Sequence, residues 1–328
     1  MKVVDIETEK VAVMTWPAVR LCTGASMPLL GLGTWLARQN ECYQAVKTGL
    51  SMGYRLIDTA EYYQNEREVG RALVEKFTTG LRREDVFVTS KLWNTRHHPD
   101  DVLPACERSL RDLGLDYLDL YLMHFPVAYA RGNNFNPFKV NGQADTLDIH
   151  FMETWKVMEK LVDAGLVKAI GVSSFNISQL EEVLTNGRIK PAVNQVECHP
   201  YLGCHRLLKY CTAKDIVLTA FCPLARPGAK GPEQFGLGSV VEDPEIMEIS
   251  KKHGKTPAQV CLKWNIQRNV VVIPGIAPPT WIKENSQIFD FELSKDDMSA
   301  INDLERNGRL VRFEPCKTHP NWPYGEEF

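Results

Sequence analysis

The sequence predicts an α/β fold, specifically a (β/α)8 TIM barrel, in which eight parallel strands close into a cylinder inside a ring of helices. Two observations support this prediction: eight short apolar runs recur along the chain, and helical stretches with recognisable start signals lie between them. Strands that alternate with helices form right-handed crossovers and therefore a parallel sheet. The 328 residues suit one barrel with long loops, so we expect a single domain over 1–328, with an N-terminal extension over about 1–18.

The expected strands are apolar over nearly their whole length, which is typical of strands buried on both faces. In chain order they are Leu29–Thr34, Arg55–Thr59, Val86–Lys91, Leu118–His124, Ala169–Ser173, Ala192–Glu197, Val217–Phe221 and Val270–Pro274.

Three helix starts have clear signals. Ser178-Gln179-Leu180-Glu181 has the pattern of a capping box. Thr256 places a capping hydroxyl before Pro257, a favoured first-turn residue. Ser294, followed by Asp297, opens another helix.

Long irregular segments are expected at the two ends of the barrel. Phe125–Ile149 and Pro223–Glu242 follow the fourth and seventh strands, at the end of the barrel where such enzymes build their sites, and long loops there are often lids. We expect the tail Asn307–Phe328 to pack over the active-site face, and Arg20–Gly33, with Gly24 in its turn, to form an N-terminal β-hairpin at the opposite end.

The composition is that of an ordinary globular protein, with 44% hydrophobic residues and a formal net charge of −3. It therefore indicates no nucleic-acid surface, and no apolar run of about 18 residues predicts a membrane span. Nine cysteines at irregular spacings indicate free thiols in a reducing, cytoplasmic compartment. Nothing demands more than a monomer.

Four reactive side chains occur at the ends of three successive strands. Asp58 and Tyr63 follow the second strand, Lys91 the third and His124 the fourth. Alone, each would be interpreted as a turn cap, a packing residue or a surface lysine. Together, at the rim where barrels hold their chemistry, they indicate an active site.

These residue types suit proton delivery to an oxygen. A tyrosine has a pKa of about 10 and is a weak acid, but a nearby ammonium group stabilises its phenolate and lowers that pKa. Asp58 would hold Lys91 beside Tyr63, and His124 would orient a substrate carbonyl. Protonating an oxygen suits hydride transfer to the adjoining carbon, and the hydride must come from a cofactor.

The chain resembles the aldo-keto reductase superfamily, close to its animal aldose and aldehyde reductase branch, from about Val19 to Phe328. The motifs that support this resemblance are Gly31-Leu32-Gly33-Thr34-Trp35, Asp58-Thr59-Ala60, Tyr63-Gln64-Asn65-Glu66, Ser90-Lys91-Leu92-Trp93, Tyr121-Leu122-Met123-His124, Gly171-Val172-Ser173 and Asn194-Gln195-Val196-Glu197-Cys198-His199-Pro200-Tyr201. The resemblance implies a catalytic tetrad of Asp58, Tyr63, Lys91 and His124, and reduction of aldehydes or ketones with NADP(H) or NAD(H).

The resemblance also implies binding residues. Ser173 and Gln195 would hold the nicotinamide carboxamide, Phe221 would stack on its ring, and Cys222 and Leu224 would lie near the pyrophosphate. The full expected cofactor set is Thr34, Trp35, Asp58, Ser173, Ser174, Gln195, Phe221, Cys222, Leu224, Pro274, Gly275, Glu284 and Asn285. The expected substrate set is Trp35, Trp93, His124, Phe125 and Val311.

The main departure from the family pattern follows the eighth strand. Gly275 and Trp281 stand where the family has a lysine and an arginine that clamp the 2′-phosphate of NADP. Each lost charged hydrogen bond would cost about 1.5–3 kcal/mol of NADP affinity, so we expect a weakened NADP preference with NAD usable. Lys283 and Arg268 are candidates for replacing the clamp by another route.

Two other patterns suggest different chemistry. Tyr43 and Lys47 match the Tyr-x-x-x-Lys signature of short-chain dehydrogenases, but no glycine-rich dinucleotide turn precedes them, so we interpret them as residues of a helix surface. Cys198-His199 and Cys204-His205 fit no standard zinc spacing, and we expect no metal.

Two functions remain open from the sequence. One is an enzyme that reduces a small-molecule carbonyl substrate. The other is a barrel that binds the cofactor with little turnover, in a structural or redox-sensing role. Oxidation of NAD(P)H with a simple aromatic aldehyde would distinguish them.

Overall fold

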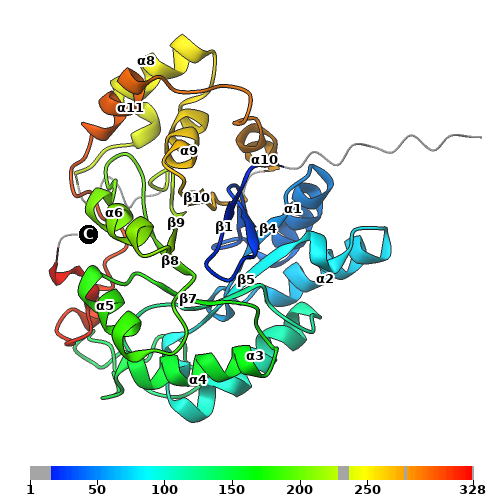
Figure 1. The fold of residues 1–328 in the computed structure, drawn as a ribbon, viewed down its shortest axis with the longest axis vertical. Helices are drawn as coiled ribbons and strands as arrows, with labels where there is room; N and C mark the ends of the chain where they lie inside the picture. Colours follow the sequence, from blue (N-terminus) through cyan, green and yellow to red (C-terminus); the bar gives the residue numbers. More distant parts are fainter. Residues whose placement is uncertain (1–15, 228–235, 277–278, 327–328) are drawn as a thin grey trace, which may run out of the picture.

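A computed structural model describes residues 16–227, 236–276 and 279–326, which form a (β/α)8 barrel (Figure 1). Eight parallel strands form one sheet in the order β3 to β10. They are β3 (Leu32–Gly33), β4 (Leu56–Asp58), β5 (Phe87–Leu92), β6 (Leu120–Met123), β7 (Ile170–Ser173), β8 (Val193–Glu197), β9 (Val217–Phe221) and β10 (Val271–Val272). Each lies in or overlaps a strand predicted from the sequence, so the predicted fold is confirmed.

The first and last strands of the sheet close the cylinder. Leu30 bridges to Val272 and Gly33 to Gly275, both in parallel, and the Gly33 N–H donates to the Pro274 carbonyl at 2.9 Å. A Cβ atom at Gly33 would lie 2.6 Å from the Ile273 carbonyl oxygen. This close approach of two backbones requires glycine.

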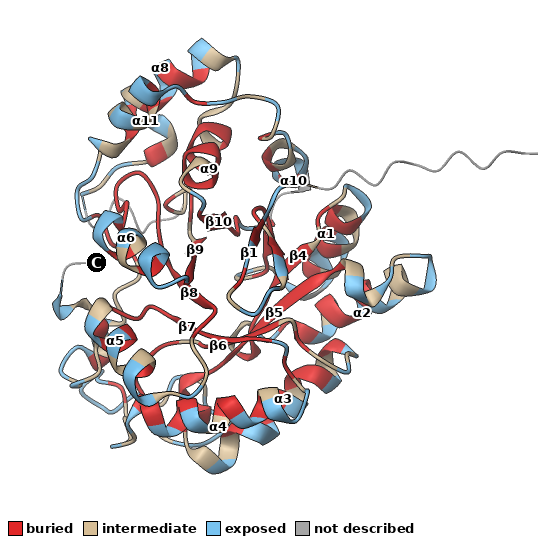
Figure 2. Ribbon diagram, viewed as in Figure 1, coloured by how far each residue is buried: buried red, intermediate tan, exposed pale blue. Residues whose placement is uncertain are grey.

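Helices surround the strands, and Figure 2 shows their buried residues facing inward. In α4, Phe151, Trp155 and Met158 are buried at spacings of four and three residues, while Glu153 and Lys156 are exposed, which is the helical period of an amphipathic face. The helices are α1 (Gln39–Ser51), α2 (Glu66–Thr78), α3 (Pro99–Leu113), α4 (Phe151–Asp163), α5 (Ile177–Asn186), α6 (His205–Ala213), α8 (Pro244–His253), α9 (Pro257–Gln267), α10 (Pro279–Ser286) and α11 (Lys295–Asn302). Short 3-10 turns are η1 (Glu61–Tyr63), η2 (Arg83–Asp85), η3 (Asn94–Arg96), η4 (Val240–Glu242), η5 (Glu314–Cys316) and η6 (Pro323–Gly325).

Two of the three predicted helix starts are confirmed. Thr256 and Ser294 cap α9 and α11, each in a capping box. The capping box predicted at Ser178 is wrong, because α5 starts earlier: Asn176 accepts from the Gln179 N–H at 2.9 Å, and the Gln179 side chain accepts from the Asn176 N–H at 3.2 Å. The Ser178 hydroxyl instead donates to Glu326.

The N-terminal hairpin consists of β1 (Ala18–Arg20) and β2 (Ser26–Pro28), two residues earlier than predicted. The Leu29 N–H donates to the Pro17 carbonyl, so the hairpin leads directly into the N-terminal end of β3. It therefore covers the barrel end opposite the one where the strands finish. The predicted extension lies outside the described residues up to residue 15.

Two irregular segments cover the C-terminal ends of the strands. Residues 124–150 follow β6 without a helix or a strand, and the Trp93 indole N–H donates to the Phe135 carbonyl at 2.7 Å. The tail packs beside them: the Asn176 side chain donates to the Pro323 carbonyl at 3.0 Å, and Phe313 stacks on Phe125 with ring centroids 4.1 Å apart. The long connection after β9 is described except for residues 228–235.

Candidate active site

The four candidate catalytic residues lie together at the C-terminal ends of neighbouring strands. Asp58 ends β4, Lys91 is the second-last residue of β5, Tyr63 ends the short turn η1, and His124 follows β6. Parallel pairing places Asp58 beside Thr89 and Lys91 beside Leu122, so the strand ends meet at one rim. The predicted convergence is confirmed as a feature of the fold.

Lys91 is the centre of this cluster. Its Nζ donates to Asp58 Oδ1, to the Thr59 carbonyl at 3.0 Å and to the Tyr63 hydroxyl at 3.3 Å. The ammonium group uses all three of its donors, which fixes its position. The side chains of Lys91 and Asp58 are 0% and 3% exposed, so this is a buried ion pair.

Burial acts on both members of this pair. It raises the pKa of Asp58 and lowers that of Lys91, and the contact between them opposes both shifts. The Gln195 amide donates to Asp58 Oδ2 at 2.7 Å and also favours the carboxylate. An ion pair with this many hydrogen bonds remains charged in spite of its burial.

The pKa of Tyr63 is raised, in contrast to the lowering predicted from the sequence. Burial raises it well above its usual value of 10.0, and the Asp58 carboxylate raises it further. The expected lowering of the Tyr63 pKa fails chiefly because burial disfavours the phenolate, and also because the Asp58 carboxylate, bonded to Lys91, opposes the charge of the ammonium group. Tyr63 is therefore a neutral phenol that holds its proton, next to an ammonium group that can receive the charge of a phenolate.

His124 is a neutral imidazole in this site. Burial lowers its pKa well below 6.5, and the charge of Lys91 lowers it further. Its ring lies edge-on to Tyr63, with centroids 5.6 Å apart, and to Trp93 at 5.1 Å. Its Nδ1 is buried and has no hydrogen-bond partner among the described residues.

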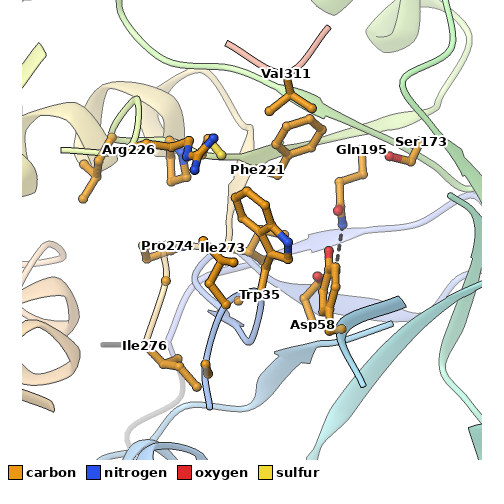
Figure 3. Close-up of a pocket in the computed structure, with 18 of the residues that line it drawn as sticks. Trp35, Asp58, Ser173, Gln195, Phe221, Arg226, Ile273, Pro274, Ile276 and Val311 are labelled. Atoms are coloured by element: carbon orange, nitrogen blue, oxygen red, sulfur yellow. Dashed lines mark hydrogen bonds between the residues drawn. The ribbon is translucent and has the colours of Figure 1, made fainter. Parts of the chain in front are cut away.

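These residues open onto a cavity of about 330 Å³ with mostly apolar walls (Figure 3). Asp58, Tyr63, His124, Ser173, Ser174 and Gln195 are polar groups on its lining. Its other lining residues are Gly33, Trp35, Leu36, Ala37, Tyr62, Trp93, Phe221, Cys222, Pro223, Leu224, Arg226, Pro227, Ile273, Pro274, Gly275, Ile276, Trp281, Val311 and Phe313. A concave apolar site with a few convergent polar groups is typical of small-molecule and cofactor binding.

Most of the expected binding residues line this cavity, and four do not. Thr34 is buried and donates to the Asn65 side chain. Phe125 is fully buried behind the wall, against Phe313. Glu284 and Asn285 lie on α10, where Glu284 accepts from the Thr256 hydroxyl at 2.6 Å.

Several lining residues were not predicted from the sequence, among them Tyr62, Phe313 and Arg226. Tyr62 stacks on Trp93 with ring centroids 3.8 Å apart, and its position next to Tyr63 was an available signal. Phe313 comes from the tail, whose path no local pattern shows. Arg226 follows β9 and lies over the Trp35 ring. A charged residue shortly after a strand is the same kind of signal that identified Lys91, so Arg226 could have been predicted in this way.

The residues of the two competing patterns have structural partners elsewhere. Tyr43 donates to Glu75 and Lys47 forms an ion pair with it at 2.6 Å, between helices α1 and α2. His199 pairs with Glu197 at 3.0 Å, and the Cys198 thiol donates to the Asn265 side chain. Among the residues that the structure describes, no group of three or more His, Cys, Asp or Glu side chains could hold a metal, and no helix is long and apolar enough to span a bilayer.

The cavity fits a nicotinamide dinucleotide. Phe221 provides a flat apolar wall, and Ser173 and Gln195 provide hydrogen-bonding groups on the same lining, which also includes Cys222, Arg226, Gly275 and Trp281. Only part of the Gln195 amide is used by Asp58. A neutral phenol and a neutral imidazole on the same wall could donate a proton and a hydrogen bond to a substrate oxygen, and a bound cofactor could reduce the adjoining carbon, so the site is compatible with a barrel oxidoreductase.

Comparison with known proteins gives the family. The chain belongs to the Aldo/keto reductase family, whose pattern it matches over residues 29–306. It is 47% identical over 321 residues to aldo-keto reductase family 1 member A1-A of Danio rerio, covering 94% of this chain and 99% of that protein. It is 42% identical over 328 residues to aldo-keto reductase family 1 member A1 of Homo sapiens, covering 96% and 100%.

A solved structure agrees with the same assignment. The aldose reductase from Schistosoma japonicum superimposes with a TM-score of 0.89 at 40% identity, covering 95% of this chain and 100% of that one. The protein is accordingly an NAD(P)-dependent carbonyl reductase. The alternative of a cofactor-binding barrel with little turnover has no observation to support it.

Proposed function

We propose that Tyr63 is the proton donor of the reduction, with His124, Lys91 and Asp58 as its partners. The observation that supports this most directly is the 3.3 Å contact between Lys91 Nζ and the Tyr63 hydroxyl, on the wall of the cavity. The reduced nicotinamide cofactor, when bound, supplies the hydride that no side chain can supply.

The side chains then have separate tasks. The ring N–H of neutral His124 donates to the substrate carbonyl oxygen and orients it toward Tyr63. As the carbonyl carbon is reduced, its oxygen takes the phenolic proton of Tyr63, and the alcohol forms. The phenolate that remains is stabilised by the Lys91 ammonium, which Asp58 keeps charged and in place.

For the cofactor, Ser173 and Gln195 would hold the carboxamide and Phe221 would pack on the nicotinamide ring. Trp35, Ser174, Cys222, Leu224, Pro274 and Gly275 would line the rest of its path, since all six line the same cavity. Glu284 and Asn285 lie on the neighbouring helix α10, and with Thr34 they complete the proposed set.

The enzyme would use NADH as well as NADPH. Neither Gly275 nor Trp281 has a charge for a 2′-phosphate, and Trp281 is 41% exposed at the edge of the cavity. Arg268 lies against Trp264 and donates to the Gly203 carbonyl, and it is not one of the residues that line the cavity. The missing clamp would reduce the preference for NADPH by about 1.5–3 kcal/mol for each lost charged hydrogen bond.

The substrate side of the cavity favours an apolar or aromatic carbonyl compound. Trp35, Trp93 and Val311 form its walls, and Phe125 supports them from behind through Phe313. The polar groups gather at the Tyr63 end, where the carbonyl oxygen would bind. Because its nine cysteines are free, we also expect the protein to work in the reducing cytoplasm. We expect a monomer, since nothing in the sequence calls for more than one chain.

The test is a kinetic comparison of NADPH and NADH with the same aromatic aldehyde. We expect turnover with both, and kcat/KM for NADPH no more than about tenfold above that for NADH. A much larger ratio would refute the weakened clamp. In parallel, Tyr63→Phe should lower kcat by about 10²-fold or more while cofactor binding, measured by calorimetry, stays unchanged. Turnover retained in that variant would refute the assigned acid.

A further inference from the structure

Two buried cysteines lie at the two ends of the turn that follows β8. Cys198 comes directly after Glu197, the last residue of β8, and Cys204 is the N-cap residue of α6. Between them, His199 and Leu202 exchange both backbone hydrogen bonds, at 3.1 and 2.8 Å, so the chain doubles back on itself. The two cysteines are 0% and 2% exposed. The turn therefore brings two thiols together beneath the surface.

The side chains of these cysteines point toward one another. Cys204 Sγ lies 3.3 Å from the carbonyl oxygen of Glu197, the residue before Cys198, and Cys198 Sγ lies 3.7 Å from the carbonyl oxygen of Gly203, the residue before Cys204. The two thiols are also hydrogen-bonded to each other. A disulfide requires two side chains that meet in this way, and the pair fulfils that requirement.

A neighbouring arginine favours one thiol of the pair as the nucleophile. Arg268 Nη1 lies 3.9 Å from Cys198 Sγ. The hydrogen bond with Cys204 and the charge of Arg268 lower the pKa of the Cys198 thiol, whereas the same hydrogen bond and burial raise the pKa of Cys204. The thiolate is the form of cysteine that attacks an oxidant. Cys198 thus suits the first attack, and Cys204 suits the step that closes a disulfide.

The same turn holds the part of the tail that reaches the cavity. The Tyr201 carbonyl, inside the turn, accepts from the Gly308 N–H at 2.8 Å. The Glu197 carboxylate accepts from the Val311 N–H at 2.9 Å. Val311 lines the cavity (Figure 3). A rearrangement of the turn would therefore shift this part of the tail and, with it, one residue of the cavity wall.

We propose that Cys198 and Cys204 form a reversible disulfide when the protein meets a peroxide, and that this bond weakens substrate binding through the tail. In the first step, the Cys198 thiolate attacks an oxygen of hydrogen peroxide, so an S–O bond forms, the O–O bond breaks and hydroxide leaves. In the second step, the Cys204 sulfur attacks Cys198 Sγ, so the S–S bond forms, the S–O bond breaks and a second hydroxide leaves.

The atoms and electrons of this reaction balance. The two thiols are oxidised by two electrons, the peroxide is reduced, and the two thiol protons join the two hydroxides as water. A dithiol reductant reverses the reaction by thiol–disulfide exchange, in which its thiolate attacks one sulfur of the bond.

The experiment treats the purified protein with hydrogen peroxide, alkylates the remaining thiols and measures the mass of the tryptic peptide Ile189–Arg206. This peptide contains Cys198 and Cys204 and no other cysteine. We expect it to carry no alkyl group and to be two hydrogen atoms lighter than the reduced peptide, and dithiothreitol should restore its reduced mass. An alkylated peptide after peroxide treatment would overturn the disulfide.

Two variants show whether the pair reacts as proposed. Cys204→Ser should form no disulfide and leave a sulfenic acid on Cys198 that dimedone traps. Cys211→Ser removes another buried thiol of α6, whose pKa burial raises to about 12, and is the matched control. It should form the disulfide as the unmodified protein does. Failure of Cys204→Ser to trap dimedone at Cys198 would overturn the proposed order of attack.

Kinetics on the same samples test the effect on the cavity. We expect oxidation to raise KM for an aromatic aldehyde about three- to tenfold and to change kcat less than about twofold, in the unmodified protein and in Cys211→Ser but not in Cys204→Ser. This part rests on the proposed substrate side of the cavity, which Val311→Ala tests separately in the reduced protein. If Val311→Ala changed KM but the disulfide did not, the connection between the turn and the cavity would be overturned and the proposed function would stand. If Val311→Ala had no effect either, the proposed substrate side itself would fail.

Discussion

Gln195 donates to Asp58 Oδ2 at 2.7 Å, and this bond joins β8 to β4 across the interior of the barrel. Lys91 donates to the other carboxylate oxygen, so both oxygens of a buried acid are satisfied. The bond also connects a residue that we assign to the cofactor with the pair that supports Tyr63. Loss of either donor would leave a buried carboxylate oxygen without a partner.

Replacing Gln195 with leucine should lower the free energy of unfolding by about 1.5–3 kcal/mol, because the Asp58 oxygen loses a donor that a side chain of similar size cannot replace. Urea denaturation of the variant would measure this. Gln143→Leu, on an exposed loop, controls for the added apolar group. Equal stability of the Gln195 variant and the unmodified protein would contradict the view that Asp58 depends on this bond.

The ion pair of Asp58 and Lys91 can be tested by a double substitution. Lys91→Met should destabilise the fold by about 3–5 kcal/mol, because it leaves a buried carboxylate without its cation. Adding Asp58→Asn removes that charge as well, so the double variant should recover much of the stability but no activity. Denaturation and turnover, measured on the same preparations, distinguish the two effects. A double variant less stable than Lys91→Met alone would argue against the pair.

The raised pKa of Tyr63 predicts how the reaction depends on pH. The phenol stays protonated up to and beyond pH 10, and His124 stays neutral because its pKa is lowered. The kcat for reduction should therefore be nearly flat between about pH 6 and 9. Oxidation of the alcohol needs the phenolate, so its kcat should rise about tenfold for each pH unit in the same range. A reduction rate that falls steadily over this range would show that Tyr63 titrates earlier than we infer.

Glu66, the first residue of α2, predicts a change of stability with pH. It accepts from Ser90 at 2.6 Å and from Ser109 at 3.2 Å, and burial raises its pKa from 4.5 to about 7. The folded state thus binds the proton more tightly than the unfolded state. The stabilisation is fully present below pH 4.5 and is lost as the pH rises to about 7, by on the order of 3 kcal/mol.

This prediction needs a variant to isolate one carboxyl group. In Glu66→Gln, the side chain cannot titrate and keeps its shape, so the difference in unfolding free energy between the two proteins should change between about pH 4.5 and 7 and be constant on either side. Denaturation at a series of pH values measures it. A constant difference over the whole range would mean that Glu66 ionises at its ordinary pKa.

Local sequence patterns were sufficient to predict the strands and to group Asp58, Tyr63, Lys91 and His124. Runs such as Val217–Phe221 are apolar throughout because both faces of a barrel strand are buried, and the observed β9 has the predicted bounds. Parallel strands finish at one rim, so residues at strand ends could be grouped before any contact was known. Helix starts were harder to predict. Ser178 and Asn176 both have side chains that can cap a helix, and α5 starts after Asn176, two residues earlier than predicted.

The residues that surround the cluster could not be placed in this way. Phe313 reaches the cavity from a tail that no periodic pattern describes, and Arg226 from a loop whose turn depends on three left-handed residues. The pKa of Tyr63 could not be predicted from Lys91 alone either, because burial and Asp58 raise it.

The sequence by itself determined the barrel, the rim at which we place its chemistry and the four side chains gathered there. Local apolar patterns indicate which strands are buried, and the alternation of strands and helices sets their parallel order. Only the tertiary structure decided which loops and tail residues wall the cavity, and whether Tyr63 is an acid or an anion at rest. Those properties depend on residues that are far apart in the sequence. Such residues together exclude water from Tyr63, and one of them, Asp58, opposes the charge of the Lys91 ammonium group.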